Sequence, residues 1–189
     1  MEIALIVIVV ILAVIVIGGI VIYNGLVQRR LRVDEAFSQI DVQLKRRWDL
    51  IPNLIEAVKG YMQFEKQVLE NVTNARANAV AAGAQGPAAQ AAAENALTGA
   101  LRSLFAVAEN YPDLKASQNV LSLQEQLTTT ENQIAFSRQH YNSTVRDYNT
   151  YIASFPGLLL AGPFGFARRE FFDAPEEVEQ VPQVNLTLQ

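Results

Sequence analysis

The chain has 189 residues, a net charge of −4 and no cysteine. The lack of cysteine excludes disulfides, thiolate catalysis and zinc–thiolate sites, and the acidic balance argues against a basic face that neutralises nucleic-acid phosphates. His140 is the only histidine, so no multi-histidine metal site fits within one chain, including a di-iron bundle that needs Glu-x-x-His twice. The composition predicts one helical domain beyond any membrane segment.

The first element is an apolar stretch from Ile3 to Ile22, built only from Ile, Val, Leu, Ala and Gly. As a helix it spans roughly 30 Å, the thickness of the hydrocarbon core of a bilayer. A single segment in lipid can satisfy its backbone only as a helix, which offsets the weak helix propensity of so many β-branched residues. We expect an uncleaved anchor over residues 1–26, because the start is acidic and no Ala-x-Ala cleavage site follows.

The charges on either side of this stretch predict its orientation. Only Met1 and Glu2 precede it, whereas six basic residues follow it: Arg29, Arg30, Arg32, Lys45, Arg46 and Arg47. The positive-inside rule then places the N-terminus outside and the C-terminal body in the cytoplasm.

Beyond the anchor, apolar residues recur at alternating steps of three and four, as in a coiled coil. The first run of this seam comprises Val33, Phe37, Ile40, Leu44, Ile51, Leu54, Val58, Tyr61, Val68, Val72, Ala75 and Ala79. Pro52 falls inside the run and removes the N–H that would bond to the Trp48 carbonyl, so we expect a kink or reversal near Asp49–Pro52. The unbroken seam favours a helix continuous to about Ala82. Burial favours a reversal and four antiparallel segments, and this second path is our prediction.

Two turns and two helices are predicted next. Gly83–Pro87 (GAQGP) is a turn, and not a phosphate loop, because the Lys-Ser/Thr of that motif is missing. An alanine-rich helix follows from about Ala88 to Asn110, with Leu97, Leu101, Leu104, Phe105 and Ala108 on its apolar face, and Tyr111–Leu114 (YPDL) is a second turn. The last helix keeps the seam spacing at Val120, Leu123, Leu127, Thr130, Ile134, Ser137, Tyr141, Thr144, Tyr148, Tyr151 and Phe155, and Pro156-Gly157 ends it.

Residues 156–189 are predicted to form an irregular tail. Pro156–Phe166 (PGLLLAGPFGF) is apolar but broken by Gly and Pro, and Arg168, Arg169, Phe171 and Phe172 follow. The acidic run Glu176, Glu177 and Glu179 precedes an extended end from Val181. Leu158–Leu160 and the paired phenylalanines either fold back on the bundle or form a contact with a partner, a subunit or the membrane surface.

Side chains that could carry chemistry are few. The seam tyrosines Tyr141, Tyr148 and Tyr151 are interpreted as core residues with hydrogen-bonded hydroxyls, and His140 as a surface or hydrogen-bonded residue. We therefore expect no catalytic, cofactor-binding or metal-binding residue and no enzyme activity.

Polar residues within the seams have a structural interpretation. Glu125 and Glu131 are expected to pair with Arg47 inside the bundle rather than to act as an acid–base pair. We hypothesise that the polar seam positions fix the register of the helices at some cost in stability: Arg47, Glu65, Thr130, Ser137 and Thr144.

Several segments resemble the LemA family in order and spacing: YNGLV (Tyr23–Val27), RVDEAFSQIDVQLKRRWDLIPNLIEAVKGY (Arg32–Tyr61), LFAVAENYPDLKAS (Leu104–Ser117), ENQIAFSRQHYN (Glu131–Asn142) and the Phe155-Pro156 stop. The resemblance implies a single-pass protein of the bacterial inner membrane, with a cytoplasmic four-helix up-and-down bundle over residues 27–155. It supplies no enzyme activity and no established catalytic residues. Some members of the family resemble magnetosome-associated proteins, and others are encoded beside membrane metalloproteases.

These observations predict a non-enzymatic scaffold or adaptor that binds the bilayer and self-associates as a homo-oligomer. The predicted helices are of unequal length, so part of the last helix is left uncovered and offers a surface for a second subunit. Gly18-Gly19 would also permit close approach of helices in the membrane. The alternative is an accessory regulator of a membrane protease or of envelope-stress machinery. A membrane hydrolase that uses His140 with a carboxylate is the enzymatic hypothesis.

Overall fold

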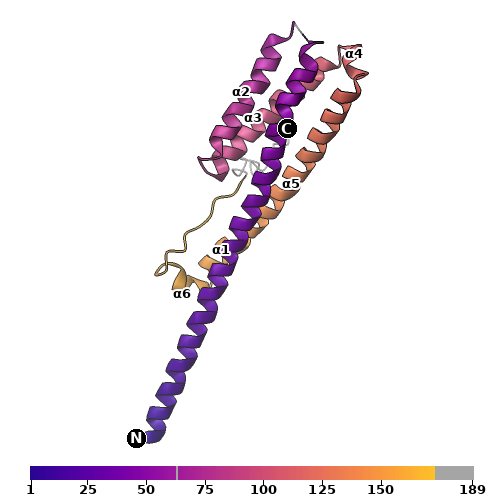
Figure 1. The fold of residues 1–189 in the computed structure, drawn as a ribbon. Coiled ribbons are helices and arrows are strands. Elements are labelled where there is room, and N and C mark those ends of the chain that lie inside the picture. Colours follow the sequence, from indigo (N-terminus) through magenta and orange to yellow (C-terminus); the bar gives the residue numbers. More distant parts are fainter. Residues whose placement is uncertain (63, 173–189) are drawn as a thin grey trace, which may run out of the picture. The chain divides into compact units, whose positions relative to one another are not determined.

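The computed structural model describes residues 1–62 and 64–172, which form helices and turns without a β-strand (Figure 1). The helices are α1 (Glu2–Lys59), α2 (Lys66–Ala82), α3 (Pro87–Ala108), α4 (Pro112–Lys115), α5 (Gln118–Ala153) and α6 (Gly157–Ala161). The predicted all-helical class is confirmed. The acidic run Glu176–Glu179 and the end of the chain from Val181 lie outside the described residues.

The chain divides into two compact units. The first comprises Met1–Leu44 and Gln133–Glu170, and the second comprises, among the described residues, 45–62, 64–132 and 171–172. Both α1 and α5 contribute residues to each unit. The sequence predicts an anchor over residues 1–26, a bundle over 27–155 and a tail over 156–189. This division into two units does not test those boundaries, and they stay a prediction.

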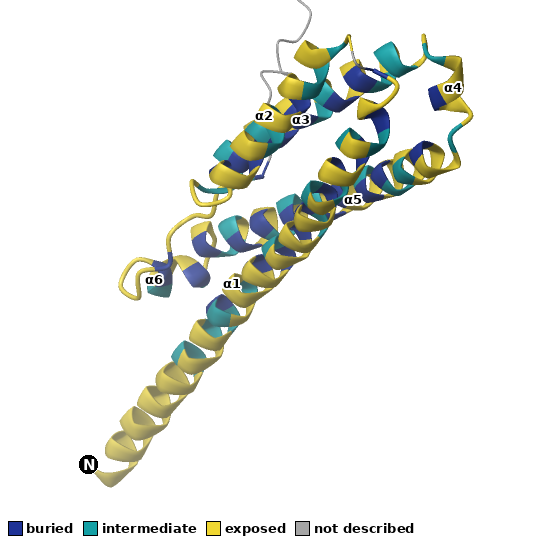
Figure 2. Cartoon of the chain, turned by 45° about the horizontal axis from the view of Figure 1, so that its top comes forward, coloured by how far each residue is buried: buried dark blue, intermediate teal, exposed yellow. Residues whose placement is uncertain are grey.

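The first twenty residues of α1 present their side chains to the surroundings. Large apolar side chains between Ile3 and Val21 are 50–80% exposed, and Figure 2 shows α1 yellow from its N-terminus up to a first teal turn, where Gly18 and Gly19 have intermediate exposure. By length and composition α1 is able to cross a membrane. So much exposed hydrocarbon is costly in water, and the apolar helix therefore suggests a membrane anchor.

The path of the chain at Pro52 differs from the prediction. α1 continues through Pro52 to Lys59, and the chain reverses at Gly60–Glu65, so both the reversal near Pro52 and the continuous helix to Ala82 are wrong. The Trp48 carbonyl, which lacks the proline N–H as a partner, accepts a hydrogen bond of 2.7 Å from Nε of Arg76 on α2. A side chain from another helix thus replaces the bond that proline removes.

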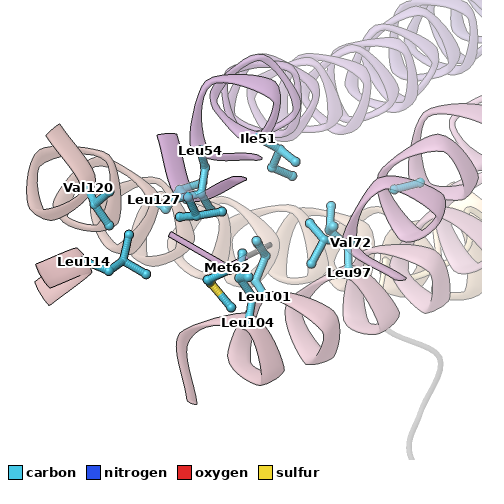
Figure 3. Close-up of a cluster of buried hydrophobic side chains, with 12 residues drawn as sticks. Ile51, Leu54, Met62, Val72, Leu97, Leu101, Leu104, Leu114, Val120 and Leu127 are labelled. Carbon is cyan, nitrogen blue, oxygen red and sulfur yellow. The ribbon is translucent and has the colours of Figure 1, made fainter. Parts of the chain in front are cut away.

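Four helical segments share the apolar core of the second unit (Figure 3). The core comprises Ile51, Leu54 and Val58 of α1, Val72 and Ala79 of α2, Leu97, Leu101 and Leu104 of α3, and Val120 and Leu127 of α5, with Met62 and Leu114 from the connections. The residues from α1, α2, α3 and α5 are predicted seam or apolar-face positions, so the predicted helix faces are confirmed, whereas Met62 is buried in place of the predicted Tyr61. The connections are short: Gly86 has a φ of 104°, which glycine adopts without strain, and Pro87 starts α3. YPDL includes the single-turn helix α4 rather than a plain turn.

In the first unit, part of α1 packs against the C-terminal part of α5. Tyr141 and Tyr148 are buried as predicted, but Val145 and Ile152 are buried in place of the predicted seam positions Thr144 and Tyr151, which are half-buried. Buried residues are Leu26, Val33, Ala36, Ile40 and Leu44 from α1, and Ile134, Tyr141, Val145, Tyr148 and Ile152 from α5. Two seam positions are exposed, Tyr61 and Phe155, because each follows the last residue of its helix.

The start of the tail combines both predicted arrangements. Of the paired phenylalanines, Phe172 is buried and Phe171 is half-buried, so folding back is confirmed for these rings, and Phe166 is buried as well. Leu158 and Leu159 of α6 are 58% and 60% exposed, so folding back is wrong for this pair.

Candidate functional site

The most polar part of the interior is a cluster around Arg47, within the second unit. Its Nη1 lies 3.3 Å from Oε2 of Glu94 and 3.0 Å from Oε2 of Glu131. Arg47 is 2% exposed and Glu94 is fully buried, whereas the Glu131 side chain is 40% exposed. The predicted pair of Arg47 and Glu131 is confirmed, but Glu125 is exposed on α5 and Glu94 takes its place.

Neutral side chains complete this cluster. Nη2 of Arg47 donates to Oγ1 of Thr98 at 2.8 Å, and Oγ1 of Thr98 donates to the Glu94 carbonyl at 3.1 Å. Nε1 of Trp48 donates to Oε1 of Glu94 at 2.6 Å, so both carboxylate oxygens of Glu94 accept hydrogen bonds. A buried carboxylate is expensive unless it is paired and hydrogen-bonded, and here both conditions are met.

The helix seams explain how these residues meet. Arg47 lies three residues after Leu44 and four before Ile51, on the core face of α1. Glu94 lies three residues before Leu97, so the leucine stripe of α3 predicts its inward position when it is extended by one step. Sequence reasoning missed Glu94 and Thr98 because the predicted apolar face of α3 begins at Leu97. It missed Trp48 because this residue lies beside the seam position Arg47 on α1 rather than on the seam.

The arrangement of the Arg47 cluster fits a structural role. The guanidinium and the Glu94 carboxylate are closed off from solvent, so a substrate cannot reach them. Within residues 1–62 and 64–172, no group of three or more His, Asp or Glu side chains is placed to hold a metal ion. The cluster can neutralise charge and fix the register of three helices, and of its three charged groups only the Glu131 carboxylate is partly exposed.

The three seam tyrosines lie in the first unit. Tyr141 donates to the Glu170 carbonyl at 2.9 Å and packs against Phe37, and Tyr148 donates to the Ala167 carbonyl at 3.0 Å. Burial raises the pKa of Tyr141 to about 12, partly opposed by the nearby Arg169 charge, and burial also raises the pKa of Tyr148. Both hydroxyls therefore stay protonated near neutral pH and hold the segment after α6. Tyr151 is half-buried, with the Arg29 guanidinium 3.8 Å from its ring centroid.

His140 lies at an open groove of the first unit with a volume of about 630 Å³. Glu35 and Asp147 line the same groove, as do Arg29, Arg32 and Arg146. Among the described residues, the His140 ring makes no hydrogen bond or ion pair with either carboxylate, and Thr144 donates to the His140 backbone carbonyl. The groove brings the histidine and carboxylates of the hydrolase hypothesis to one surface, without the oriented contact that a general base needs.

Comparison with known proteins places these features in a family. Residues 36–186 match the profile of the LemA family. The chain is similar to the magnetosome protein MamQ 2 of Paramagnetospirillum magneticum, with 27% identity over 79% of this chain, and to MamQ of Magnetospirillum gryphiswaldense, with 26% identity over the same share. The match spans 64% of the length of each of these magnetosome proteins.

A mycoplasmal relative shows a similar level of identity. The protein LemA of Metamycoplasma hominis is 26% identical to this chain, over 84% of the chain and 71% of the relative. The matched range, residues 36–186 of this chain, covers Arg47, Glu94, Glu131 and the α5 tyrosines and begins after the apolar stretch of α1.

Proposed function

Because this chain belongs to the LemA family, we propose that it is a non-enzymatic helical scaffold or adaptor of the bacterial inner membrane. The family and the apolar helix make it a membrane-associated helical protein. The observation that supports the proposal is the closed Arg47–Glu94 pair, in which the most buried charged side chains of the described residues bind one another. A scaffold needs such internal pairing and a tether, and it needs no open catalytic group.

The proposed topology has the N-terminus outside and the helical units in the cytoplasm. It is supported by Arg29, Arg30 and Arg32, which follow the apolar stretch within two to three turns of α1. A reporter fused after Gln189 tests this arrangement. Activity of a reporter that works only in the cytoplasm is expected, and activity only of a reporter that works outside would reverse the topology.

Self-association is the second part of the proposal. It is supported by exposed apolar side chains on α5, including Leu121 and Phe136, which are 45% and 71% exposed. Light scattering of the detergent-solubilised chain should give a mass of two or more copies after subtraction of the micelle. A monomer at every concentration would contradict assembly.

Regulation of a membrane protease is a second candidate, and one surface of the second unit favours a protein partner. Ile55, Met62 and Leu69 line an apolar groove of about 740 Å³, and Phe64 at the same groove is 92% exposed. A photoreactive amino acid at Phe64 would identify the partner in intact cells. Crosslinks to a second copy support self-association, and crosslinks to a membrane protease support the regulator. Labelling of lipid or water alone argues against both at this surface.

A further inference from the structure

The residues around α6 form an apolar surface that the first unit does not cover. Phe155 is 80% exposed, Leu158 58%, Leu159 60% and Phe164 57%. We call these four residues the α6 patch. They fall within ten positions of one another, in a part of the chain that is otherwise anchored by hydrogen bonds to α5. A cluster of exposed large apolar side chains is typical of a contact with a partner or a membrane.

Contacts to Tyr23 fix where the α6 patch lies along α1. The Phe164 ring centroid is 5.1 Å from that of Tyr23, and the Phe166 ring centroid is 5.8 Å from it. Tyr23 directly follows Ile22, the last residue of the apolar stretch. Figure 1 shows α6 beside the part of α1 that follows this stretch. If Ile3–Ile22 spans the hydrocarbon core, Tyr23, Phe164 and the α6 patch lie at its edge, where aromatic residues are enriched.

A basic hollow adjoins the same segment. Arg30, Arg168 and Arg169 line a hollow of about 210 Å³ together with Tyr148. The Arg30 guanidinium lies 5.3 Å from the centroid of the Phe166 ring, so apolar and basic groups meet here. Asp34 pairs with Arg169 at 2.8 Å, and Arg30 and Arg168 leave the hollow with a net positive charge.

The distance of this hollow from the end of the apolar stretch places it near the polar layer of a bilayer. Arg30 follows Ile22 by eight residues, which is about 12 Å along a helix and less when the helix is tilted. The polar layer of one leaflet is roughly 5–7 Å thick, and an arginine side chain reaches back toward the hydrocarbon by several ångströms. The guanidinium groups can therefore meet lipid phosphates while the α6 patch meets acyl chains.

We propose that α6 and the turn to Phe164 lie in the interface of the membrane that α1 crosses, with the Arg30–Arg168–Arg169 hollow on the phosphate of an anionic lipid. This proposal depends on the proposed anchoring, because the depth of the α6 patch is defined by the span. The bilayer is chosen over a second copy or a soluble protein because Tyr23 joins the patch to the end of the span. The basic hollow beside it complements anionic headgroups.

The lack of cysteine allows a direct test on the full chain. Single variants Leu159→Cys, Val21→Cys and Val42→Cys are labelled with an environment-sensitive fluorophore and reconstituted into vesicles that contain phosphatidylglycerol. Val21 reports the span, and Val42, exposed on α1 about 30 Å beyond Ile22, is the matched water control. We expect blue-shifted emission at positions 159 and 21, quenching of both by doxyl lipids, and neither effect at position 42.

The outcomes separate the two proposals. Quenching at position 21 together with water-like emission at 159 would overturn the interfacial placement and leave the anchor intact. Water-like emission at both positions would overturn the anchor itself. Blue-shifted emission at 159 without quenching by lipid would indicate a protein contact, and would also overturn the placement.

The role of the arginines in binding anionic lipid is tested with the label at the same position, 159. Quenching by doxyl lipids at position 159 should be stronger in phosphatidylglycerol vesicles than in neutral vesicles. In a Leu159→Cys chain that also carries Arg30→Gln and Arg168→Gln, this gain should be lost. Arg102→Gln, an exposed arginine on α3, is the control and should keep the gain. An equal gain with and without Arg30 and Arg168 would show that the hollow does not bind anionic lipid.

Discussion

Glu94 shows how one buried carboxylate is accommodated in an apolar helix interface. It is fully buried, yet Arg47 and Trp48 donate to its two oxygens at 3.3 and 2.6 Å. Removing one partner of a buried pair leaves an uncompensated charge, whereas replacing both partners by apolar groups is often neutral. Loss of one partner should therefore lower the free energy of unfolding by more than the intact pair contributes to it, and in this sense the cluster couples α1 to α3.

The first prediction concerns this pair. Arg47→Leu should lower the free energy of unfolding by about 3–5 kcal/mol, because Glu94 stays buried without its cation. Arg47→Leu combined with Glu94→Leu should recover much of that loss. Denaturant unfolding measures both, and emission of Trp48, the only tryptophan, reports the cluster.

Glu56 provides the control for this experiment. It pairs with Lys59 on the surface of α1, with both side chains more than 60% exposed, so Glu56→Gln should change stability by less than about 0.5 kcal/mol. An Arg47→Leu chain as stable as Glu56→Gln would contradict the structural role of the cluster. An unchanged oligomer state in Arg47→Leu would rule out a role in register.

Tyr141 predicts a pH dependence at the alkaline end. Its pKa is raised to about 12, chiefly by burial, from an ordinary value near 10. A raised pKa means that the folded state favours the protonated hydroxyl. Its contribution to stability is complete below pH 10 and is lost as the pH rises through about 12. Tyr141→Phe should therefore flatten the fall in unfolding midpoint between pH 9 and pH 11.5, relative to the parent chain. Tyr61→Phe, at an exposed ring, should leave the slope unchanged.

At the scale of elements, the continuation of α1 past Pro52 depends on a side chain of α2. Pro52 deprives the Trp48 carbonyl of its helical donor, and Arg76 of α2 supplies the replacement at 2.7 Å. A carbonyl left without a partner in a part-buried position costs free energy comparable to a lost hydrogen bond. Continuity of α1 past Pro52 and docking of α2 are thus linked through one bond.

A double-mutant cycle tests this link. Arg76→Leu should destabilise the chain by about 1–3 kcal/mol, because the Trp48 carbonyl loses its donor. The same change should cost less when Pro52→Ala is also present, since the N–H restored at position 52 can bond to Trp48. Unfolding in denaturant gives the coupling energy, and Arg46→Leu, at an exposed arginine of α1, is the control. Additive effects of Arg76→Leu and Pro52→Ala would show that the two residues are independent.

The sequence predicted the helix faces well because burial repeats with the helix period. Val33, Ile40, Leu54 and Leu127 are all buried, as their spacing requires. Local rules failed at Pro52, because the donor that replaces its N–H lies 28 residues after Trp48 and leaves no local signal. Within the candidate cluster, Arg47 was predictable from the seam, and Glu131 was one of the two carboxylates predicted to pair with it. Glu94 was missed although Leu97, three residues later, marks its face.

At the scale of the whole molecule, the apolar start of α1 dominates behaviour in solution. Sixteen Ile, Val and Leu residues between Ile3 and Ile22 contribute roughly −5 to −10 kcal/mol to membrane insertion. The exposed Leu158 and Leu159 were less predictable. In the interfacial placement proposed above, their environment would depend on where the membrane lies, which the spacing of neighbouring residues does not encode.

Charges placed within this stretch test the anchor. Ile11→Lys with Ile15→Lys should cost about 5–7 kcal/mol of insertion free energy, which cancels most of the gain. The doubly substituted chain should leave the membrane fraction on carbonate extraction. Leu31→Lys with Val42→Lys, at exposed positions beyond the stretch, is the matched control and should stay. Retention of the Ile11/Ile15 variant would contradict a single-span anchor.

The hydrogen bond from Arg76 to the Trp48 carbonyl has a consequence for the order in which the helices become stable during synthesis. Arg76 is translated 24 residues after Pro52, which at ribosomal speed is a delay of roughly one to five seconds. During that delay the nascent helix lacks the donor that compensates for its proline. The turns of α1 beyond Trp48 should therefore become stable only once α2 has emerged from the ribosome, after the apolar stretch has already been made.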